Sequence, residues 1–302
     1  MCIRDRDYWI SCLINPSAGR EFECGGDRFT LATKPRRILV VGGGPAGLEA
    51  ARVSAERGHN VTLAEAGTAL GGQFRLAGLQ PRRSQITDLI RWYEGQFKKV
   101  QVSVRLNTFM EAADVREFGA DVVVLATGSL PRATGFQRAL PHLDPVPGID
   151  KPNVYSVEDV MSRNARPGKR VIGRDDIGHW HGGGTAWHLA EAGHEVIIVT
   201  SWPVVGFELI RTTADWPLRR RLKQLGAMWL TEAAVTEWYG DAATVLDLAV
   251  GSETRVEADA LVLATTNAST NWLAYELAGD SFEIHTIGDA VAPRHANMAI
   301  YE

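Results

Sequence analysis

Residues 37–67 read RILVVGGGPAGLEAARVSAERGHNVTLAEAG, and this stretch decides the fold. The apolar run Ile38 to Val41 is followed at once by glycines, as expected where a strand turns into a helix. Gly58 stands where that helix is expected to end, and a second apolar run begins shortly after it. The pattern predicts a strand, a glycine turn, a helix and a second, parallel strand.

A second stretch of the same design occupies residues 170–201 and reads RVIGRDDIGHWHGGGTAWHLAEAGHEVIIVTS. Both stretches end their helix with the signature A-E-x-G-H-x-V, which places Gly193 like Gly58. Two such units imply two parallel sheets with helices on their faces. The sequence therefore predicts an α/β protein with two Rossmann-like dinucleotide-binding domains.

The first glycine turn has the spacing that binds a dinucleotide. Gly42, Gly44 and Gly47 form G-x-G-x-x-G directly after the first strand, and Glu65 follows the second strand. Gly42 permits the tight turn, Gly44 lets the backbone approach a diphosphate, and Gly47 lets the helix pack on the strand. Glu65 is placed to accept hydrogen bonds from the hydroxyls of an adenosine ribose. A glycine turn without a ligand would not need this acidic residue.

The second turn departs from this pattern. Superposing the two loops places Gly173 at the first glycine position, Asp175 at the second and Gly178 at the third. A carboxylate at the second position would repel a diphosphate and fill the space that only glycine leaves free. The second strand then ends in Thr200, which offers no charge to a ribose. We therefore expect a dinucleotide-like domain with a degenerate loop.

Composition excludes several classes of function. The chain has 302 residues, 45% of them hydrophobic, and its 36 acidic and 32 basic residues give a net charge of -4. No cluster of Lys and Arg could follow a nucleic acid backbone, and no apolar run reaches the roughly 18 to 20 residues that span a bilayer. We predict a cytoplasmic protein that binds neither nucleic acid nor membrane.

The cysteines and histidines do not predict chemistry in the folded body. Cys2, Cys12 and Cys24 are the three cysteines, and their spacing matches no compact metal pattern. The segment LGGQFRLAGLQP lacks the redox cysteines that disulfide reductases carry after their LGG motif. Three histidines, His179, His181 and His188, lie on a turn and a helix start without the geometry of a metal site.

Further motifs resemble a known family. GGGPAGLEAA, LGGQ at 70–73, ATGSLPR at 126–132 and IGDAVAP at 287–293 together resemble flavoproteins with two dinucleotide domains. SCLINPSAGRE at 11–21 and ADWPLRRRLKQLGA at 214–227 resemble the C-terminal half of trimethylamine and dimethylamine dehydrogenases and of 2,4-dienoyl-CoA reductases. The resemblance implies a glutathione-reductase-like FAD/NAD(P) fold in which the second domain is inserted in the first.

The resemblance also implies boundaries and cofactors. It divides the chain into a linker at 1–34, an FAD- or ADP-binding domain at 35–145 and 271–302, and an NAD(P)-like domain at 150–268. The relatives begin with an FMN-bearing barrel and a four-iron four-sulfur cluster, of which only Cys12 matches a ligand here. Both ends are therefore expected to be truncated, and this portion alone is expected to be inactive. The barrel of the full-length chain and an electron-transfer flavoprotein are the implied partners.

At matching positions the resemblance assigns residues to FAD or ADP. No catalytic residue is implied within the chain. Six segments are expected to contact this ligand. Gly42, Gly44, Pro45, Ala46 and Gly47 would hold the diphosphate, Glu65 and Ala66 the ribose, Gly72 and Gln73 the neighbouring phosphate edge, and Thr108 and Phe109 the adenine. Thr127 and Gly128 would close the domain beside the ligand, or only end a strand, and Asp289 after Gly288 would contact the ribityl chain if the ligand is FAD.

Three functions remain open. The first is the nucleotide-binding portion of an amine dehydrogenase-like, flavin-dependent oxidoreductase. The second is a non-catalytic ADP-binding module. The third is an NAD(P)H-dependent reductase of the dienoyl-CoA reductase type, which the degenerate second loop disfavours. The sequence names neither the substrate nor the choice between FAD and ADP.

Overall fold

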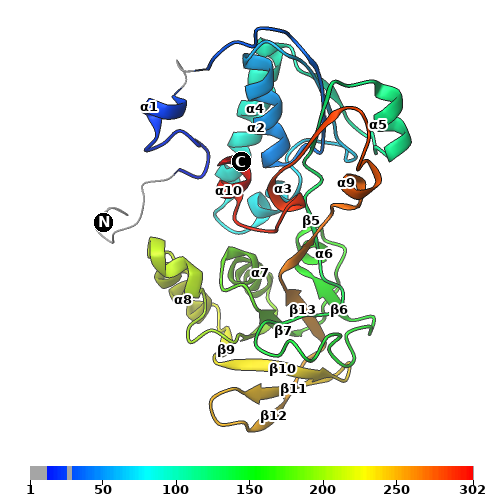
Figure 1. The fold of residues 1–302 in the computed structure, drawn as a ribbon. Helices are drawn as coiled ribbons and strands as arrows, with labels where there is room; N and C mark the ends of the chain where they lie inside the picture. The colour runs from blue at the N-terminus through cyan, green and yellow to red at the C-terminus, as the bar shows by residue number, and fades with distance from the viewer. Residues whose placement is uncertain (1–11, 26–28, 302) are drawn as a thin grey trace. The chain divides into compact units, whose positions relative to one another are not determined.

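A computed structural model describes residues 12–25 and 29–301, and these residues form two compact units (Figure 1). Unit 1 contains the described residues up to Gly78, Ser84–Leu130 and the chain from Ala268 onward. Unit 2 contains Leu79–Arg83 and Pro131–Asn267. Each unit is built on a parallel sheet, so the predicted class of two Rossmann-like domains, one inserted in the other, is confirmed.

Unit 1 is organised by a five-stranded parallel sheet with the order β15-β4-β1-β2-β3. Its central strands are almost wholly apolar because helices cover both faces. The order reverses direction at β1, which lies between β2 and β4, so a crevice is expected at the carboxyl ends of β1 and β4. The strands are β1 (Arg37–Val41), β2 (Asn60–Ala64), β3 (Ser103–Arg105), β4 (Val122–Leu125) and β15 (Glu283–Thr286).

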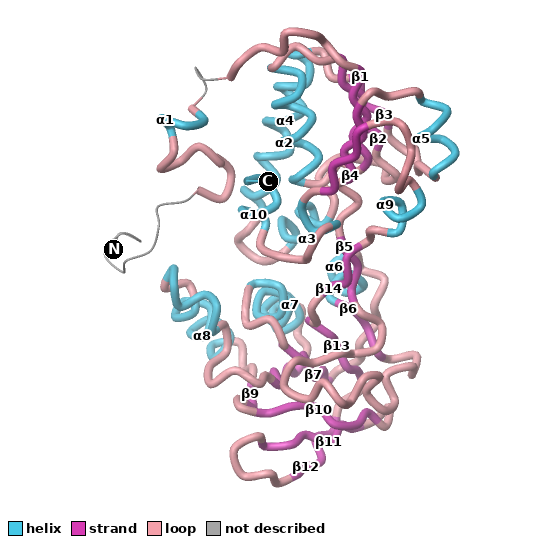
Figure 2. Tube along the Cα trace, viewed as in Figure 1, coloured by secondary structure: helices cyan, strands magenta, loops and turns pink. Residues whose placement is uncertain are grey.

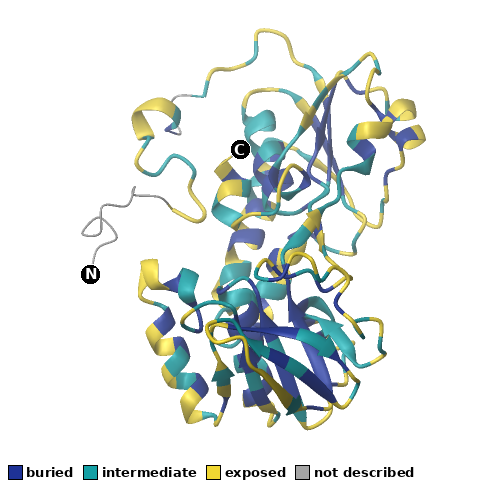
Figure 3. Ribbon diagram, turned by 60° about the horizontal axis from the view of Figure 1, so that its bottom comes forward, coloured by how far each residue is buried: buried dark blue, intermediate teal, exposed yellow. Residues whose placement is uncertain are grey.

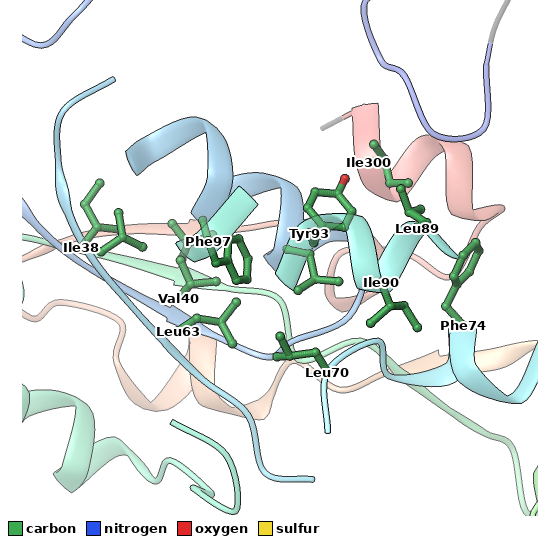
Figure 4. Close-up of a cluster of buried hydrophobic side chains, with 14 of the residues drawn as sticks. Ile38, Val40, Leu63, Leu70, Phe74, Leu89, Ile90, Tyr93, Phe97 and Ile300 are labelled. Carbon is green, nitrogen blue, oxygen red and sulfur yellow. The ribbon is translucent and has the colours of Figure 1, made fainter. Parts of the chain in front are cut away.

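The two faces of this sheet bury separate cores. One core lies under α2 (Pro45–Glu56) and α4 (Asp88–Val100), as Figure 4 shows in close-up. The other lies under α5 (Ala112–Phe118) and α9 (Trp272–Glu276), on the opposite side of the strands in Figure 2. The remaining elements of unit 1 are α1 (Glu21–Cys24), α3 (Gln73–Leu79), α10 (Ala296–Tyr301) and the 3₁₀ turns η2 (Ser84–Thr87) and η4 (Gly288–Ala290).

A buried polar group joins α2 to α4. Tyr93 is fully buried and donates its hydroxyl to Glu49 at 3.0 Å, while Arg52 donates two hydrogen bonds to the same carboxylate. Burial and the neighbouring Glu49 carboxylate raise the pKa of Tyr93. Because a buried carboxylate needs its donors, this group fixes how the two helices pack beside the nucleotide-type turn.

Unit 2 has its own five-stranded parallel sheet with the order β6-β13-β7-β8-β9, and Figure 3 shows its strands as largely buried. The central strands are β7 (Arg170–Asp175), β8 (Glu195–Val199) and β13 (Ala260–Ala264), with β6 (Val154–Ser156) and β9 (Met228–Leu230) outside them. The helices are α6 (Val157–Met161), α7 (Trp180–Glu191) and α8 (Asp215–Gln224), with the 3₁₀ turn η3 at Phe207–Thr212. An antiparallel sheet of β10 (Ala233–Trp238), β11 (Ala242–Asp247) and β12 (Glu253–Glu257) packs on it around the fully buried Trp238.

The chain passes from one unit to the other in two strands, β5 (Ser129–Pro131) and β14 (Asn267–Ser269), which pair with each other. Residues 131–149 group with unit 2, whereas the sequence placed the boundary near 145–150. The physical reason is a set of contacts to β7. The buried guanidinium of Arg174 donates to the carbonyls of Gly135 and Phe136, which ties the segment to that strand.

The predicted N-terminal linker is described only in part, and the prediction that the chain does not cross a membrane concerns its helices. Of the predicted linker 1–34, the structure describes residues 12–25 and 29–34, and Cys2 lies outside the described residues. Within the described ranges, no helix combines the length and apolar character that a membrane crossing requires.

Candidate nucleotide site

The site of unit 1 is built on the turn from β1 into α2. Gly42 has a φ of +108°, and a Cβ there would lie 2.2 Å from the carbonyl oxygen of Ala126. A Cβ on Gly47 would lie 1.9 Å from the carbonyl oxygen of Gly42. Both positions therefore require glycine for close backbone contact, as the sequence predicted.

Gly44 differs from these two glycines in what surrounds it. It is the N-cap of α2, its φ of -75° suits any residue, and a Cβ would meet no atom within 4 Å. Its side-chain position therefore faces open space in front of the helix. The first amides of α2 have no intrahelical acceptors, and the helix dipole adds positive potential at this end. Open space at a helix N-terminus of this kind suits an anion such as a diphosphate.

Glu65 lies directly after β2 and faces the same turn. Its Oε2 accepts a hydrogen bond from the amide of Gly43 at 2.7 Å, and its Oε1 accepts one from the amide of Gly67 at 2.6 Å. Each carboxylate oxygen keeps a further lone pair that can accept a ribose hydroxyl. Glu65 is thus held at the mouth of the turn by the chain's own backbone, with Ala66 exposed beside it.

A second glycine turn closes over the first. The amide of Gly71 donates to the carbonyl of Gly43 at 2.7 Å, and a Cβ on Gly72 would lie 3.3 Å from the Cα of Gly44. Gln73, which begins α3, donates its side-chain amide to the carbonyl of Ser129. These contacts bring LGGQ to the edge of the diphosphate space.

The late G-D motif reaches the same place from the end of the chain. A Cβ on Gly288 would lie 2.7 Å from the Cβ of Ala46, which sets η4 against the first turn of α2. Asp289 accepts hydrogen bonds from the hydroxyl of Ser129 at 2.9 Å and from the amide of Arg294 at 3.0 Å. Asp289 therefore also holds Ser129 and the chain at Arg294 in place.

The remaining predicted residues lie around this centre. Thr127 donates its hydroxyl to the carbonyl of Thr270, and Gly128, with a φ of +75°, accepts the amide of the same residue. Thr108 donates its amide to the carbonyl of Glu65 at 2.9 Å. Phe109 is 62% exposed and stacks on Trp272 with ring centroids 6.1 Å apart.

Sequence reasoning missed the residues that join these segments to one another. Gly43 links the turn to Glu65 and to Gly71, and Ser129 links Gln73 to Asp289. Their signals were present in the quoted motifs, because Gly43 stands inside GGGPAG and Ser129 inside ATGSLPR. Neither residue type indicates such a role without knowledge of what lies opposite.

A cavity of unit 1 lies away from this turn. It has a volume of about 580 Å³ and lies at the amino ends of β1, β4 and β15, where Ile38, Val122 and Glu283 line it. Ligands of open parallel sheets bind at the carboxyl ends of the strands. A ligand of this sheet is therefore expected at the turn Gly42–Gly47 and not in this cavity.

The turn of unit 2 differs from the predicted superposition, which is wrong by several residues. Gly173 lies inside β7, where it pairs with Ile198 and Val262. Strand pairing aligns Arg174 with Val41, since each is opposite the last residue of the second strand. Asp175 thus stands at the first glycine position.

Aligning the two turns by their helix N-caps instead of their strands shifts the correspondence by two residues. The N-cap of α7 is His179, as Gly44 is the N-cap of α2, and Gly182 takes the place of Gly47. Two residues separate Val41 from Gly44, but four separate Arg174 from His179. The loop of unit 2 is therefore two residues longer, and the second glycine position is occupied by a histidine.

Asp175 itself lies inside the unit. It is 2% exposed, its Oδ1 accepts the amides of Ile177 at 3.1 Å and Gly178 at 2.9 Å, and burial raises its pKa to about 6. The adjacent Asp176 accepts hydrogen bonds from the backbone and guanidinium of Arg138, although burial still raises its pKa. Both aspartate carboxylates of this loop therefore accept hydrogen bonds from donors of the chain itself.

The histidines of α7 do not form a metal site. The ring of His181 lies 3.3 Å from the carboxylate of Glu158, and His188 has a pKa lowered by burial. Over the described part of the chain, no group of three His, Cys, Asp or Glu side chains could hold a metal ion. Cys12, the predicted cluster ligand, is an exposed free thiol.

Comparison with known proteins bears on both turns. A family model described as pyridine nucleotide-disulphide oxidoreductase matches residues 36–288, a range that contains both turns and the G-D motif. The chain belongs to this family. Within the matched range this member has no cysteine, so it lacks the thiols of the family's disulfide reductases.

Relatives in this oxidoreductase family include both dehydrogenases and reductases. The chain is 39% identical over 203 residues to N,N-dimethylglycine/sarcosine dehydrogenase of Chromohalobacter salexigens, covering 66% of this chain and 28% of that protein. It is 35% identical over 300 residues to cinnamate reductase of Clostridium sporogenes, covering 97% of this chain and 41% of that protein. The resemblance to amine dehydrogenases and related reductases is thereby confirmed.

Solved structures agree. Histamine dehydrogenase from Rhizobium sp. 4-9 superposes with a TM-score of 0.90 at 30% identity, covering 96% of this chain and 46% of that one. The chain spans less than half the length of these relatives. Thioredoxin reductase of T. acidophilum, with a TM-score of 0.60 at 16% identity, shares the fold.

Proposed function

We propose that unit 1 binds the ADP portion of an adenine nucleotide, either FAD or ADP, within a flavin-dependent oxidoreductase of the amine dehydrogenase type. The observation that carries this proposal is the difference among the glycines of the first turn. Gly42 and Gly47 are required by backbone contact, whereas Gly44 faces open space at the N-terminus of α2. A glycine kept where the fold does not need one is explained by a ligand that approaches the backbone there.

Each part of the nucleotide has a partner among the described residues. The turn and the first amides of α2 would hold the diphosphate, and Glu65 would accept the ribose hydroxyls. Gly72 lies against Gly44 and narrows the diphosphate space from the side of α3. Thr108 and Phe109 follow β3, where the exposed ring of Phe109 offers a face to the adenine.

The choice between FAD and ADP depends on the region around Asp289. In FAD the ribityl chain would pass this carboxylate and the flavin would supply the redox chemistry, whereas ADP would supply none. Asp289 already accepts the hydroxyl of Ser129 and the amide of Arg294, and Gln73 reaches Ser129 from the opposite side. A ribityl hydroxyl would have to share Asp289 with these two donors.

The catalytic centre of the full-length enzyme lies outside these residues in this proposal. The relatives that resemble this chain are more than twice its length. The resemblance described from the sequence implies an FMN-bearing barrel and an iron–sulfur cluster in the remaining part of a longer protein. Cys12 would then be a cluster ligand, and an electron-transfer flavoprotein would accept the electrons. The chain described here would be inactive alone, in the cytoplasm.

A non-catalytic ADP-binding module is the second candidate, and one observation favours it. No cysteine occurs in the chain beyond Cys24, and no group of three metal-binding side chains occurs among the residues described for unit 1. The two candidates differ in a simple measurement. Protein purified with bound FAD shows the visible absorbance of a flavin, and protein purified with ADP does not.

The test of nucleotide binding compares two glycine substitutions. Gly44→Ala places a methyl group in the diphosphate space without a clash, and we expect it to lower ADP affinity at least tenfold by calorimetry while the protein stays folded. Gly95→Ala in α4 also adds a methyl group that meets no atom within 4 Å, and it should leave ADP affinity unchanged. Equal ADP affinity in the parent and in Gly44→Ala would refute the site.

Thermal stability gives an independent reading of the same site. A ligand present at 100 times its Kd stabilises the native state by about 2.7 kcal/mol. ADP at that concentration should therefore raise the Tm of the parent and of Gly95→Ala more than that of Gly44→Ala, for which a tenfold weaker affinity leaves about 1.4 kcal/mol. A Tm of the parent that does not respond to ADP or FAD would count against the whole proposal.

A further inference from the structure

We propose that Asp175 fixes the turn of unit 2 in the role that Glu65 has in unit 1, and that this relocated carboxylate, together with Trp202, excludes pyridine dinucleotides from unit 2. The inference concerns the second turn, and it does not depend on whether unit 1 binds ADP. It assigns Asp175 and Trp202 as residues that determine ligand specificity by exclusion.

The position equivalent to Glu65 in unit 2 is Thr200. Each residue directly follows the second strand of its unit, and each donates its amide to the end of the neighbouring strand. Glu65 donates to the carbonyl of Arg105 at 2.8 Å, and Thr200 donates to the carbonyl of Leu230 at 3.0 Å. Thr200 is 1% exposed and carries no charge for a ribose. The acid that would recognise an adenosine ribose is therefore absent from its place.

The backbone amide that an acid at this position would accept nevertheless has a carboxylate acceptor. In unit 1 the residue before the helix N-cap is Gly43, whose amide donates to Glu65 Oε2 at 2.7 Å. In unit 2 the corresponding residue is Gly178, whose amide donates to Asp175 Oδ1 at 2.9 Å. A carboxylate thus secures the same backbone group in both units, from the end of the second strand in one and from the end of the first strand in the other.

The longer loop makes this relocation possible. Because the loop has two additional residues, Asp175 takes the place under the helix that Gly42 occupies in unit 1. The carboxylate carbon of Asp175 would lie 2.4 Å from a Cβ on Gly182, so the side chain fits there only against a glycine. Buried under α7, Asp175 can hold the loop but cannot reach a ribose outside it.

Trp202 fills the space next to the loop. A Cβ on Gly178 would lie 2.8 Å from the Nε1 of Trp202, and this nitrogen donates to the carbonyl of Asp176 at 3.3 Å. The indole also stacks on Phe207, with ring centroids 4.6 Å apart and an angle of 11° between the planes. An adenosine would lie between the loop and the end of the second strand, where this indole now packs.

The first test is a double-mutant cycle in unit 2. It moves the carboxylate from Asp175 to Thr200, the position equivalent to Glu65 of unit 1. In the parent, Thr200→Glu adds a further buried carboxylate close to Asp175 and should lower the denaturation midpoint. In Asp175→Ala, the amide of Gly178 has lost its acceptor, so the same Thr200→Glu change should raise the midpoint. Asp215→Ala, which removes a buried carboxylate of unit 2 that binds Arg219, is the matched background in which Thr200→Glu should still destabilise.

The second test is a titration with NADH and NADPH, followed by fluorescence. It uses Gly44→Ala, in which binding to unit 1 is weakened, and it requires no change at Asp175. We expect no saturable binding up to millimolar concentration. Saturation at micromolar NADH would overturn the proposal, as would a Thr200→Glu change that destabilises the Asp175→Ala background as much as the parent.

Discussion

Replacing Asp175 by asparagine should make the protein progressively more stable than the parent as the pH rises from 4 to 7. Asparagine keeps the shape of the side chain and an oxygen that can accept the amides of Ile177 and Gly178, but it carries no charge. The parent must hold a buried, ionised carboxylate at pH 7. The Oδ2 of Asp175 has no hydrogen-bond partner among the described residues, so nothing offsets the desolvation of that oxygen.

The size of the effect follows from the pKa. Burial raises the pKa of Asp175 from 3.8 to about 6, against the opposing influence of the two amides and of His181. Since a difference of one in pKa is worth about 1.4 kcal/mol, the raised value corresponds to a penalty of about 3 kcal/mol on the ionised form. Asp176 adds to this penalty because its own carboxylate lies nearby.

The direction is set by which state binds the proton more tightly. A carboxyl group with a raised pKa in the folded protein contributes stability that is fully present below 3.8 and is lost as the pH rises through about 6. The asparagine variant has no such loss. Its free energy of unfolding relative to the parent should therefore rise by up to about 3 kcal/mol between pH 4 and pH 7.

Urea denaturation, monitored by tryptophan fluorescence, measures the difference in free energy of unfolding between the parent and Asp175→Asn in unit 2. Six of the nine tryptophans lie in unit 2, so the fluorescence reports mainly its unfolding: Trp180, Trp187, Trp202, Trp216, Trp229 and Trp238. The free energies of parent and variant are compared at each pH, so the titration of carboxyl groups that do not interact with Asp175 cancels.

The control is Asp259→Asn. Asp259 accepts the amides of Lys169 and Arg170, and these hydrogen bonds lower its pKa. Its contribution is present above the ordinary pKa and is lost as the pH falls, so its variant should show no rise relative to the parent between pH 4 and pH 7. The reasoning about Asp175 would fail if its variant followed the same flat course.

Three further substitutions test other parts of the structure. Gly47→Ala puts a Cβ 1.9 Å from the carbonyl oxygen of Gly42, so it should lower the Tm by circular dichroism, unlike Gly44→Ala; an unchanged Tm would mean that the turn can relax. Tyr93→Phe removes the buried hydrogen bond to Glu49 and should cost about 1.5–3 kcal/mol in urea denaturation; a cost near zero would show that Arg52 alone satisfies that carboxylate. Arg174→Met removes the buried donor to the carbonyls of Gly135 and Phe136, so limited proteolysis should cut within residues 131–149 sooner than in the parent; identical cleavage would show that other contacts hold this segment.

The sequence by itself determined the two βαβ units and the glycine turn of unit 1. The reason is that these features are local. The apolar run before Gly42, the glycine spacing and the acid after the second strand all lie within 31 residues, and their periodicity follows from strand and helix geometry. The motif at Gly288 and Asp289 was identified by its resemblance to the family's late G-D pair, and only the structure places η4 against Ala46.

Only the tertiary structure decided where Asp175 lies and which residues share a site. The two additional residues of the second loop are visible only when strand pairing and the helix N-cap are compared, because the sequence permits more than one superposition of the glycines. Ser129 and Asp289 form a hydrogen bond although they are 160 residues apart. Residues 131–149 join unit 2 because the buried Arg174 binds their carbonyls. Long-range contacts of this kind leave no periodic signal in the chain, since what fixes them is the burial of a polar group against a particular partner.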